Sequence, residues 1–265
     1  MRTSFFLILL LYSFTALGQI DLQKPFKDCN LKGSTTIYDY KSKRWIFSDS
    51  LDATKQTLPA STFKIINLLI ALEAGVIKNE YDTVKWKGKT DTALYGYRPE
   101  IYKDMTVKEA FEVSAGWVFI ELAKKVGRIR YKHYLEICQY GNGNVSEQGT
   151  DFWNFGAFAV SPINQIQFLL NVYEETTPFS KRNVAILKRV MMTEKTGTYT
   201  IRSKTGWTRV LEKDWGWWIG YVERKNNTYF FATRVSKDLA TVNPDFGPCR
   251  KEITKNILKQ LRAIE

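Results

Sequence analysis

Alternating apolar and polar residues near both ends of the chain predict β-strands. Short polar turns separate these stretches, as is typical of antiparallel pairs. The expected strands span 34–40, 44–47, 198–203, 215–222 and 228–235. Because strands of this kind need a shared apolar face, we expect a single antiparallel sheet built from both chain ends.

Between these strands the apolar positions recur at helical spacing, from Pro59 to about Arg189, with Gly and Pro residues as breaks. A last segment, Arg250 to Ile264, has the 3.6-residue period of an amphipathic helix. The pattern therefore predicts an α+β fold in which terminal helices cover the sheet and a helical lobe lies alongside. A cleft between the sheet and the helical lobe is the expected substrate site.

The first eighteen residues have the pattern of an export signal. Arg2 precedes an apolar run from Phe5 to Leu11, and small residues follow at Ala16 and Gly18. A membrane anchor is the alternative, but the run is shorter than the roughly 20 residues of a spanning helix. We expect a signal peptide at residues 1–18 and a mature domain at 19–265, secreted into the periplasm and free of the membrane.

Charge and composition argue against nucleic acid and against a bound metal as partners. The 265 residues carry a formal net charge of +12. No run of five or more like charges occurs, which favours a basic solvated surface over nucleic-acid binding. Such a surface attracts anionic small molecules. His133, the only histidine, is expected on a helix surface, and the cysteines Cys29, Cys138 and Cys249 are scattered, so a metal site is not expected. One disulfide is possible, but the spacing does not select the pair.

The helix predicted over Pro59–Gly75 is apolar in nearly every direction and is therefore expected to be buried. It nevertheless carries Ser61 and Lys64, which are three residues apart and so share a face. Burial and the helix N-terminus both disfavour a charged lysine. A neutral Lys64 could remove the hydroxyl proton of Ser61 and make it a nucleophile. The alternative is that Ser61 caps the helix and Lys64 extends to solvent.

Three later motifs favour the chemical interpretation. Ser114 begins a further apolar helical run and could pass protons, and the turn at residues 140–142 could project the amide of Asn142 into a cleft. Lys204-Thr205-Gly206 follows an alternating strand, where it could face an anionic substrate. A second Lys-Thr-Gly at Lys195 lacks the preceding strand, so Lys204 is preferred.

These motifs resemble those of the penicillin-interacting serine enzymes. Within that group the chain resembles class D (oxacillinase-type) serine β-lactamases over nearly the whole mature chain. The resemblance is carried by residues 59–64, 71–77, 140–142, 152–153, 203–207 and 217–223. It implies the β-lactamase/transpeptidase-like fold and hydrolysis of β-lactam antibiotics, which confers resistance.

The resemblance also implies roles for single residues. Ser61 would form the acyl-enzyme, and Lys64 would react with CO2 or bicarbonate to give N6-carboxylysine, the general base for acylation and deacylation. Trp153 would hold this carbamate through its indole N–H, and Ser114 would shuttle protons. No organic cofactor and no metal is implied.

On the opposite wall, Lys204, Thr205 and Gly206 would face the substrate. The backbone N–H groups of Ser61 and Trp207 would form the oxyanion hole, which stabilises the developing charge in acyl transfer. Arg250 would bind the substrate carboxylate.

Two positions depart from the family pattern. Gly116 stands where the family usually has valine, and Asn154 where it often has leucine. In relatives these apolar side chains shield the carboxylated lysine. We therefore expect a wetter cleft and strong dependence of activity on bicarbonate, unless Trp117 or Phe119 provides the shielding.

Other interpretations of the same motifs remain open. A β-lactam sensor that stays acylated, a cell-wall peptidase or a binding protein with a decayed site would each fail to turn over a β-lactam. The sequence does not select among penicillins, oxacillin, cephalosporins and carbapenems, nor between a monomer and a homodimer.

Overall fold

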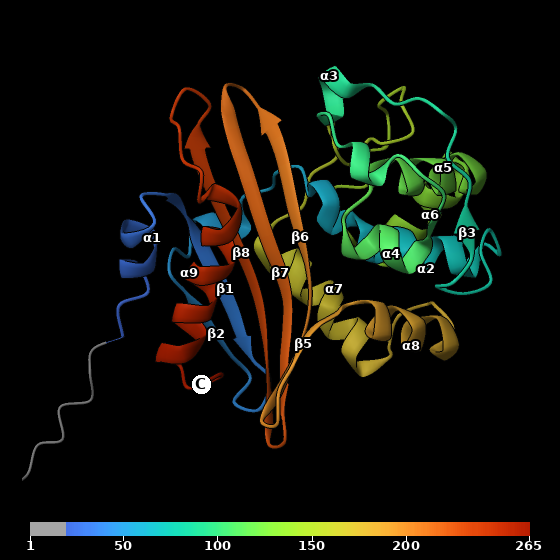
Figure 1. Cartoon of the computed structure of the whole chain (residues 1–265). Coiled ribbons are helices and arrows are strands. Elements are labelled where there is room, and N and C mark those ends of the chain that lie inside the picture. Colours follow the sequence, from blue (N-terminus) through green and yellow to red (C-terminus); the bar gives the residue numbers. More distant parts are fainter. Residues whose placement is uncertain (1–19) are drawn as a thin grey trace, which may run out of the picture.

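The computed structural model describes residues 20–265, and its centre is one antiparallel sheet of six strands (Figure 1). The strands follow the order β2-β1-β8-β7-β6-β5, so strands from the two chain ends meet where β1 pairs with β8. Their bounds are β1 Lys32–Asp39, β2 Arg44–Phe47, β5 Met192–Lys195, β6 Tyr199–Val210, β7 Lys213–Arg224 and β8 Asn227–Asp238. The predicted sheet is confirmed, whereas the predicted signal peptide lies outside the described residues.

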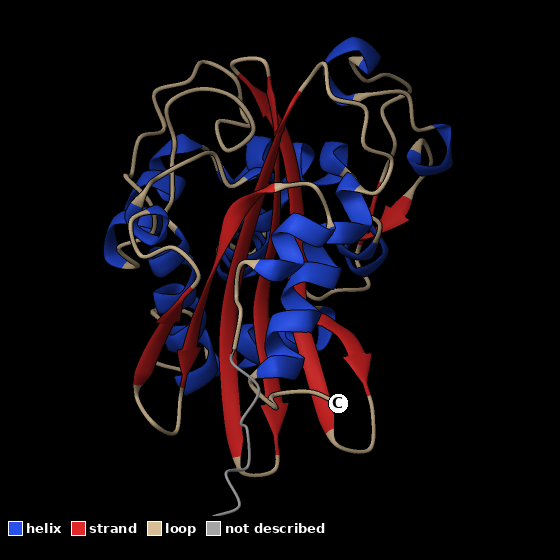
Figure 2. Cartoon of the chain, turned by 90° about the vertical axis from the view of Figure 1, so that its left-hand side faces the viewer, coloured by secondary structure: helices blue, strands red, loops and turns tan. Residues whose placement is uncertain are grey.

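Helices cover both faces of the sheet (Figures 1 and 2). On one face lie the terminal helices α1 (Lys24–Asp28) and α9 (Phe246–Gln260). On the other is the predicted helical lobe, made of α2 (Lys64–Glu73), α4 (Val107–Glu112), α5 (Gly116–Val126), α6 (Arg128–Ile137), α7 (Pro162–Glu174) and α8 (Lys181–Val190). Short elements complete the lobe and its connections: η1 (Asp52–Thr54), η2 (Ala60–Phe63), η3 (Pro99–Ile101), α3 (Thr92–Tyr95), β3 (Thr83–Val84) and β4 (Met105–Thr106).

Strand β7 shows why the sheet is buried on both sides. Its alternate residues point to opposite faces. Trp217 and Tyr221 pack in the core shared with the helical lobe, whereas Trp218 and Val222 pack in the core under the terminal helices. Within residues 20–265, no helix has both the length and the apolar character needed to cross a bilayer.

Two predicted helix boundaries were wrong, and each error has a local cause. The segment expected as one helix begins with the 3₁₀ turn η2, in which Ala60 has φ of 50°, and becomes an α-helix only at Lys64. The last helix begins at Phe246, before the predicted Arg250, because Pro248 lies in its first turn, where a missing N–H costs nothing. Arg250 is therefore held inside the helix and not at its end.

A disulfide between Cys29 and Cys249 joins α1 to α9. The bonded residues are 220 positions apart in the chain, and their Cα atoms lie 6.0 Å from each other. Cys138 is free and half-buried. The bridge thus links the two ends of the described chain on one face of the sheet.

We expect the Cys29→Ser/Cys249→Ser variant to be less stable by about 2–5 kcal/mol, because the bridge restricts the unfolded chain across a long loop. For a domain of this size that corresponds to a fall in Tm of roughly 4–20 °C. Thermal unfolding followed by circular dichroism, with and without reductant, measures the effect. Cys138→Ser is the control, and an unchanged Tm after reduction of the wild type would contradict the expectation.

Candidate active site

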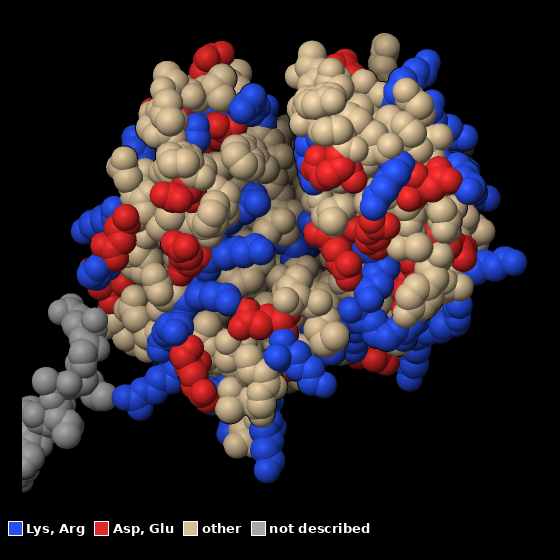
Figure 3. Space-filling model, in the orientation of Figure 1, with Lys and Arg blue, Asp and Glu red and all other residues tan. Residues whose placement is uncertain are grey.

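A cleft of about 660 Å³ lies where the sheet edge meets the helical lobe. Figure 3 shows this hollow between the two parts of the molecule, with Lys and Arg side chains along it. The charged residues that line it are Lys64, Arg98, Glu112, Arg209 and Arg250. Cationic side chains therefore outnumber the one carboxylate, and the cleft favours anionic ligands.

Ser61 and Lys64 lie side by side at the floor of the cleft. In the 3₁₀ turn η2 residues three apart eclipse each other, so the Lys64 side chain stands directly over Ser61. Lys64 Nζ donates a hydrogen bond of 2.7 Å to Ser61 Oγ. Ser61 lines the cleft, whereas Lys64 is only 1% exposed.

Burial determines the charge of Lys64. Desolvation, followed by the positive charge of Arg98, lowers the pKa of its amine from 10.5 to about 7. The ring of Phe119 lies 5.4 Å from Lys64 Nζ. Among the described residues Lys64 has no carboxylate ion-pair partner. A substantial fraction of Lys64 is thus neutral near pH 7.

Trp153 lies against the same turn. Its indole stacks on Phe63 with ring centroids 4.9 Å apart, and its carbonyl accepts a hydrogen bond from the backbone N–H of Ala60. The indole Nε1 is buried and has no hydrogen-bond partner within residues 20–265. A buried donor without a partner is costly, so this N–H is suited to a polar group that forms on a neighbouring side chain.

Ser114 connects the helical lobe to the sheet. It follows the last turn of α4 with φ of 60°, a left-handed conformation that is unfavourable for a serine. In this conformation Ser114 Oγ accepts a hydrogen bond of 3.1 Å from Nζ of Lys204 on β6. Burial and then the charge of Lys64 hold the pKa of Lys204 well below its usual value.

Strand β6 presents a free edge to the cleft. Its pairing with β5 ends at Arg202, and beyond that point only β7 pairs with it. Gly206 comes so close to η2 that an added Cβ would lie 2.8 Å from the carbonyl oxygen of Pro59. Thr205 and Trp207 line the cleft on either side of this contact. The glycine therefore allows the strand edge and the Ser61 turn to form one site.

Arg250 reaches the cleft from α9. Its Nη1 donates a hydrogen bond of 2.5 Å to the carbonyl oxygen of Gly206, and its guanidinium lies 5.9 Å from the Trp207 ring centre. Burial lowers its pKa to about 10, so it stays charged at neutral pH. The fold thus places Ser61, Lys64, Ser114, Thr205, Gly206, Trp207 and Arg250 on one cleft, with Trp153 stacked against the Ser61 turn and Lys204 hydrogen-bonded to Ser114.

Other sequence expectations had mixed outcomes. Lys195 is exposed and away from the cleft, which supports the choice of Lys204. The expectation that no strand precedes Lys195 was wrong, because Lys195 ends strand β5. His133 lies exposed on α6, as predicted. The expectation for Asn142 was wrong, since its amide donates to the carbonyl of Ala157 and does not line the cleft.

Sequence reasoning missed several residues of the cleft, among them Arg98 and Tyr95. Arg98 donates through Nη2 to the carbonyl of Val113, and its charge acts on Lys64. The Tyr95 hydroxyl donates to Asp151, which ties α3 to the segment before Trp153. Arg98 lies in an irregular segment and Tyr95 in the four-residue helix α3, which is too short to show a period, so no signal in the sequence identified them.

We expect Gly206→Ala to destabilise the fold by about 1–3 kcal/mol, because the new methyl group would overlap backbone atoms of the Ser61 turn. The corresponding fall in Tm is roughly 2–12 °C. Gly197→Ala in the second Lys-Thr-Gly is the matched control, since an added Cβ there meets no atom within 4 Å. Equal Tm values for the two variants would show that the close approach is not needed.

Comparison with known proteins agrees with this geometry. The family model for the penicillin binding protein transpeptidase domain matches residues 28–259. Beta-lactamase OXA-10 of Pseudomonas aeruginosa is 38% identical over 239 residues, which cover 89% of this chain and 86% of that protein. Beta-lactamase OXA-48 of Klebsiella pneumoniae is 38% identical over 241 residues, covering 90% and 87%.

Solved structures that resemble this chain are also class D β-lactamases. The crystal structure of the class D beta-lactamase from Sebaldella termitidis ATCC 33386 has a TM-score of 0.87 and 40% identity, and the match covers 94% of this chain and 98% of that one. The class D YbXI from Nostoc has a TM-score of 0.85 and 34% identity over 92% of this chain and 99% of its own. From its sequence, its fold and its cleft, the chain belongs to the class D β-lactamase family.

Proposed function

We propose that this protein hydrolyses β-lactam antibiotics through an acyl-enzyme on Ser61. The observation that carries the proposal is the buried amine of Lys64, which lies 2.7 Å from Ser61 Oγ and has a pKa lowered to about 7. A neutral amine at that distance accepts the hydroxyl proton as Oγ attacks the lactam carbonyl. Family membership supports the same reaction.

The remaining cleft residues would orient the substrate and stabilise its transition state. Arg250 and Thr205 would bind the carboxylate of the β-lactam, since a guanidinium forms strong charge-assisted hydrogen bonds with such groups. The backbone N–H groups of Ser61 and Trp207 would donate to the developing oxyanion. Ser114, hydrogen-bonded to Lys204, would pass a proton to the leaving nitrogen.

We further propose that Lys64 is carboxylated by CO2. The neutral amine and the unpartnered Nε1 of Trp153 fit this modification, because the indole N–H would donate to the new carboxylate. When present, the carbamate supplies a general base for both acylation and deacylation. Phe119 covers one side of the lysine. The proposal needs no organic cofactor and no metal.

The proposed setting is outside the cytoplasm. The predicted signal peptide at residues 1–18 would direct export to the periplasm, leaving residues 19–265 as the mature enzyme. The Cys29–Cys249 disulfide is consistent with an oxidising compartment. Its partner there would be the β-lactam itself, and neither nucleic acid nor membrane is required.

The proposal predicts repeated turnover of nitrocefin and oxacillin by the mature chain. Ser61→Ala and Lys64→Ala should lower kcat by at least about 10³-fold, because nucleophile and base act as one unit. Lys204→Ala should also impair turnover, whereas the matched Lys195→Ala should not, since Lys195 is exposed and away from the cleft. Stopped-flow spectroscopy and mass spectrometry separate turnover from acylation.

One result would contradict the proposal. A single stoichiometric burst that leaves a persistent adduct on Ser61 would identify a β-lactam sensor or a penicillin-binding protein. Hydrolysis that survives Ser61→Ala would place the chemistry elsewhere.

Carboxylation of Lys64 should depend on pH and on residue 116. At a fixed concentration of dissolved CO2 the carbamate should increase as pH rises through about 7, because only the neutral amine reacts. Gly116→Val should lower the bicarbonate concentration needed for half-maximal activity. An added Cβ at Gly116 meets no atom within 4 Å, so the larger side chain has room to shield the lysine.

Carbon-13 NMR with labelled bicarbonate, together with initial rates, measures both effects. Lys64→Ala should lack the carbamate signal and is the control. Full activity in CO2-depleted buffer, or an unchanged requirement in Gly116→Val, would show that Phe119 and its neighbours already shield Lys64 sufficiently.

A further inference from the structure

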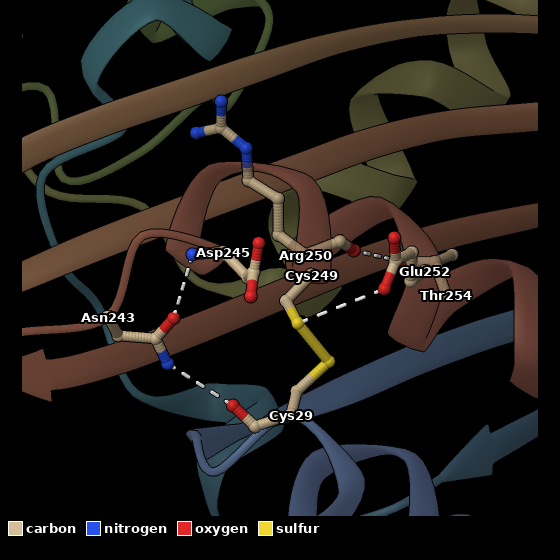
Figure 4. Close-up of a disulfide and its surroundings, with 7 residues drawn as sticks. All are labelled: Cys29, Asn243, Asp245, Cys249, Arg250, Glu252 and Thr254. Atoms are coloured by element: carbon tan, nitrogen blue, oxygen red, sulfur yellow. Dashed lines mark hydrogen bonds between the residues drawn. A yellow bond between two sulfur atoms is a disulfide. The ribbon is translucent and has the colours of Figure 1, made fainter.

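The disulfide lies next to the arginine that we assign to substrate binding (Figure 4). Cys249 directly precedes Arg250 in α9, and its sulfur is bonded to Cys29. The carbonyl of Arg250 accepts a hydrogen bond of 2.8 Å from Thr254 Oγ1. Thr254 Oγ1 also bonds Thr233 on β8, so the Arg250 backbone is held on its C-terminal side by the sheet and on its N-terminal side by Cys249.

The connection into α9 is exposed, and Phe246 is buried where the helix begins. Residues 239–245 connect β8 to the helix along the surface, and Val242 among them is 91% exposed. Asp245 stands at the N-cap position without a side-chain capping bond. Phe246 is the main internal anchor, since its ring lies 4.9 Å from that of Trp207.

Cys29 holds this turn from both sides. Its sulfur is bonded to Cys249 within the turn, and its carbonyl accepts a hydrogen bond of 3.3 Å from Asn243 Nδ2 just before the turn. Cys29 is itself well anchored, because Phe26 and Leu31 beside it are buried in the core under the terminal helices. The N-terminal segment thus acts as the fixed support.

The guanidinium has little restraint of its own. Arg250 Nε is buried and has no hydrogen-bond partner within residues 20–265, and no carboxylate there forms an ion pair with Arg250. Its Nη1 donates to the carbonyl of Gly206, and the guanidinium lies 5.9 Å from the Trp207 ring centre. The position of the Arg250 guanidinium consequently depends strongly on where α9 places the Arg250 backbone.

We propose that the Cys29–Cys249 disulfide is a positioning element for Arg250, so that recognition of the β-lactam carboxylate depends on oxidation of this cysteine pair. The inference rests on the proposed function. Loss of the bridge frees the first turn of α9 and weakens binding of the carboxylate. The Ser61 turn packs in the core shared with the helical lobe, away from the core under the terminal helices, and keeps its geometry.

The test compares two substrates that differ only in the recognised group, benzylpenicillin and its methyl ester. For Cys29→Ser/Cys249→Ser, kcat/KM for benzylpenicillin should fall by about three- to tenfold, mainly through KM, because a charge-assisted contact is weakened. For the ester it should change by less than about twofold. Cys138→Ser is the matched control and should change neither value.

A double-mutant cycle separates positioning from general destabilisation. In an Arg250→Ala background, loss of the disulfide should have no further effect on benzylpenicillin, since the group that it positions is gone. Assays contain EDTA, because the freed thiols and Glu252 are close enough to bind a metal ion. Wild type reduced with TCEP, and still folded by circular dichroism, provides a second route if the variant folds poorly.

The outcomes are distinguishable. Equal losses for the acid and the ester, or additive effects of the Cys and Arg250 changes, would overturn the positioning role and leave a purely structural bridge. If the oxidised wild type turned over neither substrate, the proposed function would be overturned, and this inference with it.

Discussion

The burial of the Lys64 amine beside Ser61 is the constraint on which the rest of the site depends. An amine taken out of water favours its neutral form unless a carboxylate compensates for the lost hydration. The described part of the chain places none beside it and instead adds the positive charge of Arg98. Placing Lys64 directly after a 3₁₀ turn keeps its side chain over Ser61 while the apolar helix α2 remains in the core.

Burial affects the charge of Lys204 as well as that of Lys64. Both lysines are buried, and the charge of Lys64 contributes to the lowered pKa of Lys204. The positive charge of Lys64 thus adds to burial in disfavouring a charged Lys204. An anionic substrate entering this positive cleft reduces the repulsion. The binding of an anion and the charge of the two lysines are therefore linked.

Strands and helices that show a local apolar period were predictable from the sequence. Alternation located most strands, including the one that carries Lys204, but not β5, which ends at Lys195. Contacts between distant segments were not predictable in the same way. Nothing local pairs Cys29 with Cys249, directs the amide of Asn142 toward Ala157, or turns Arg98 into the cleft. These features depend on how packed elements meet, which periodicity does not encode.

The site has two parts that are held by different means. Ser61, Lys64 and Trp153 belong to a turn and helix packed in the large core, where aromatic contacts such as Phe63 on Trp153 fix their positions. Arg250 belongs to a helix on the opposite face of the sheet, whose first turn is fixed by a covalent bond to the N-terminal segment. The two parts meet at the edge of β6, where Gly206 lies against the Ser61 turn and accepts the hydrogen bond of Arg250. The Ser61 turn and Arg250 are therefore held in different cores but share one strand, β6.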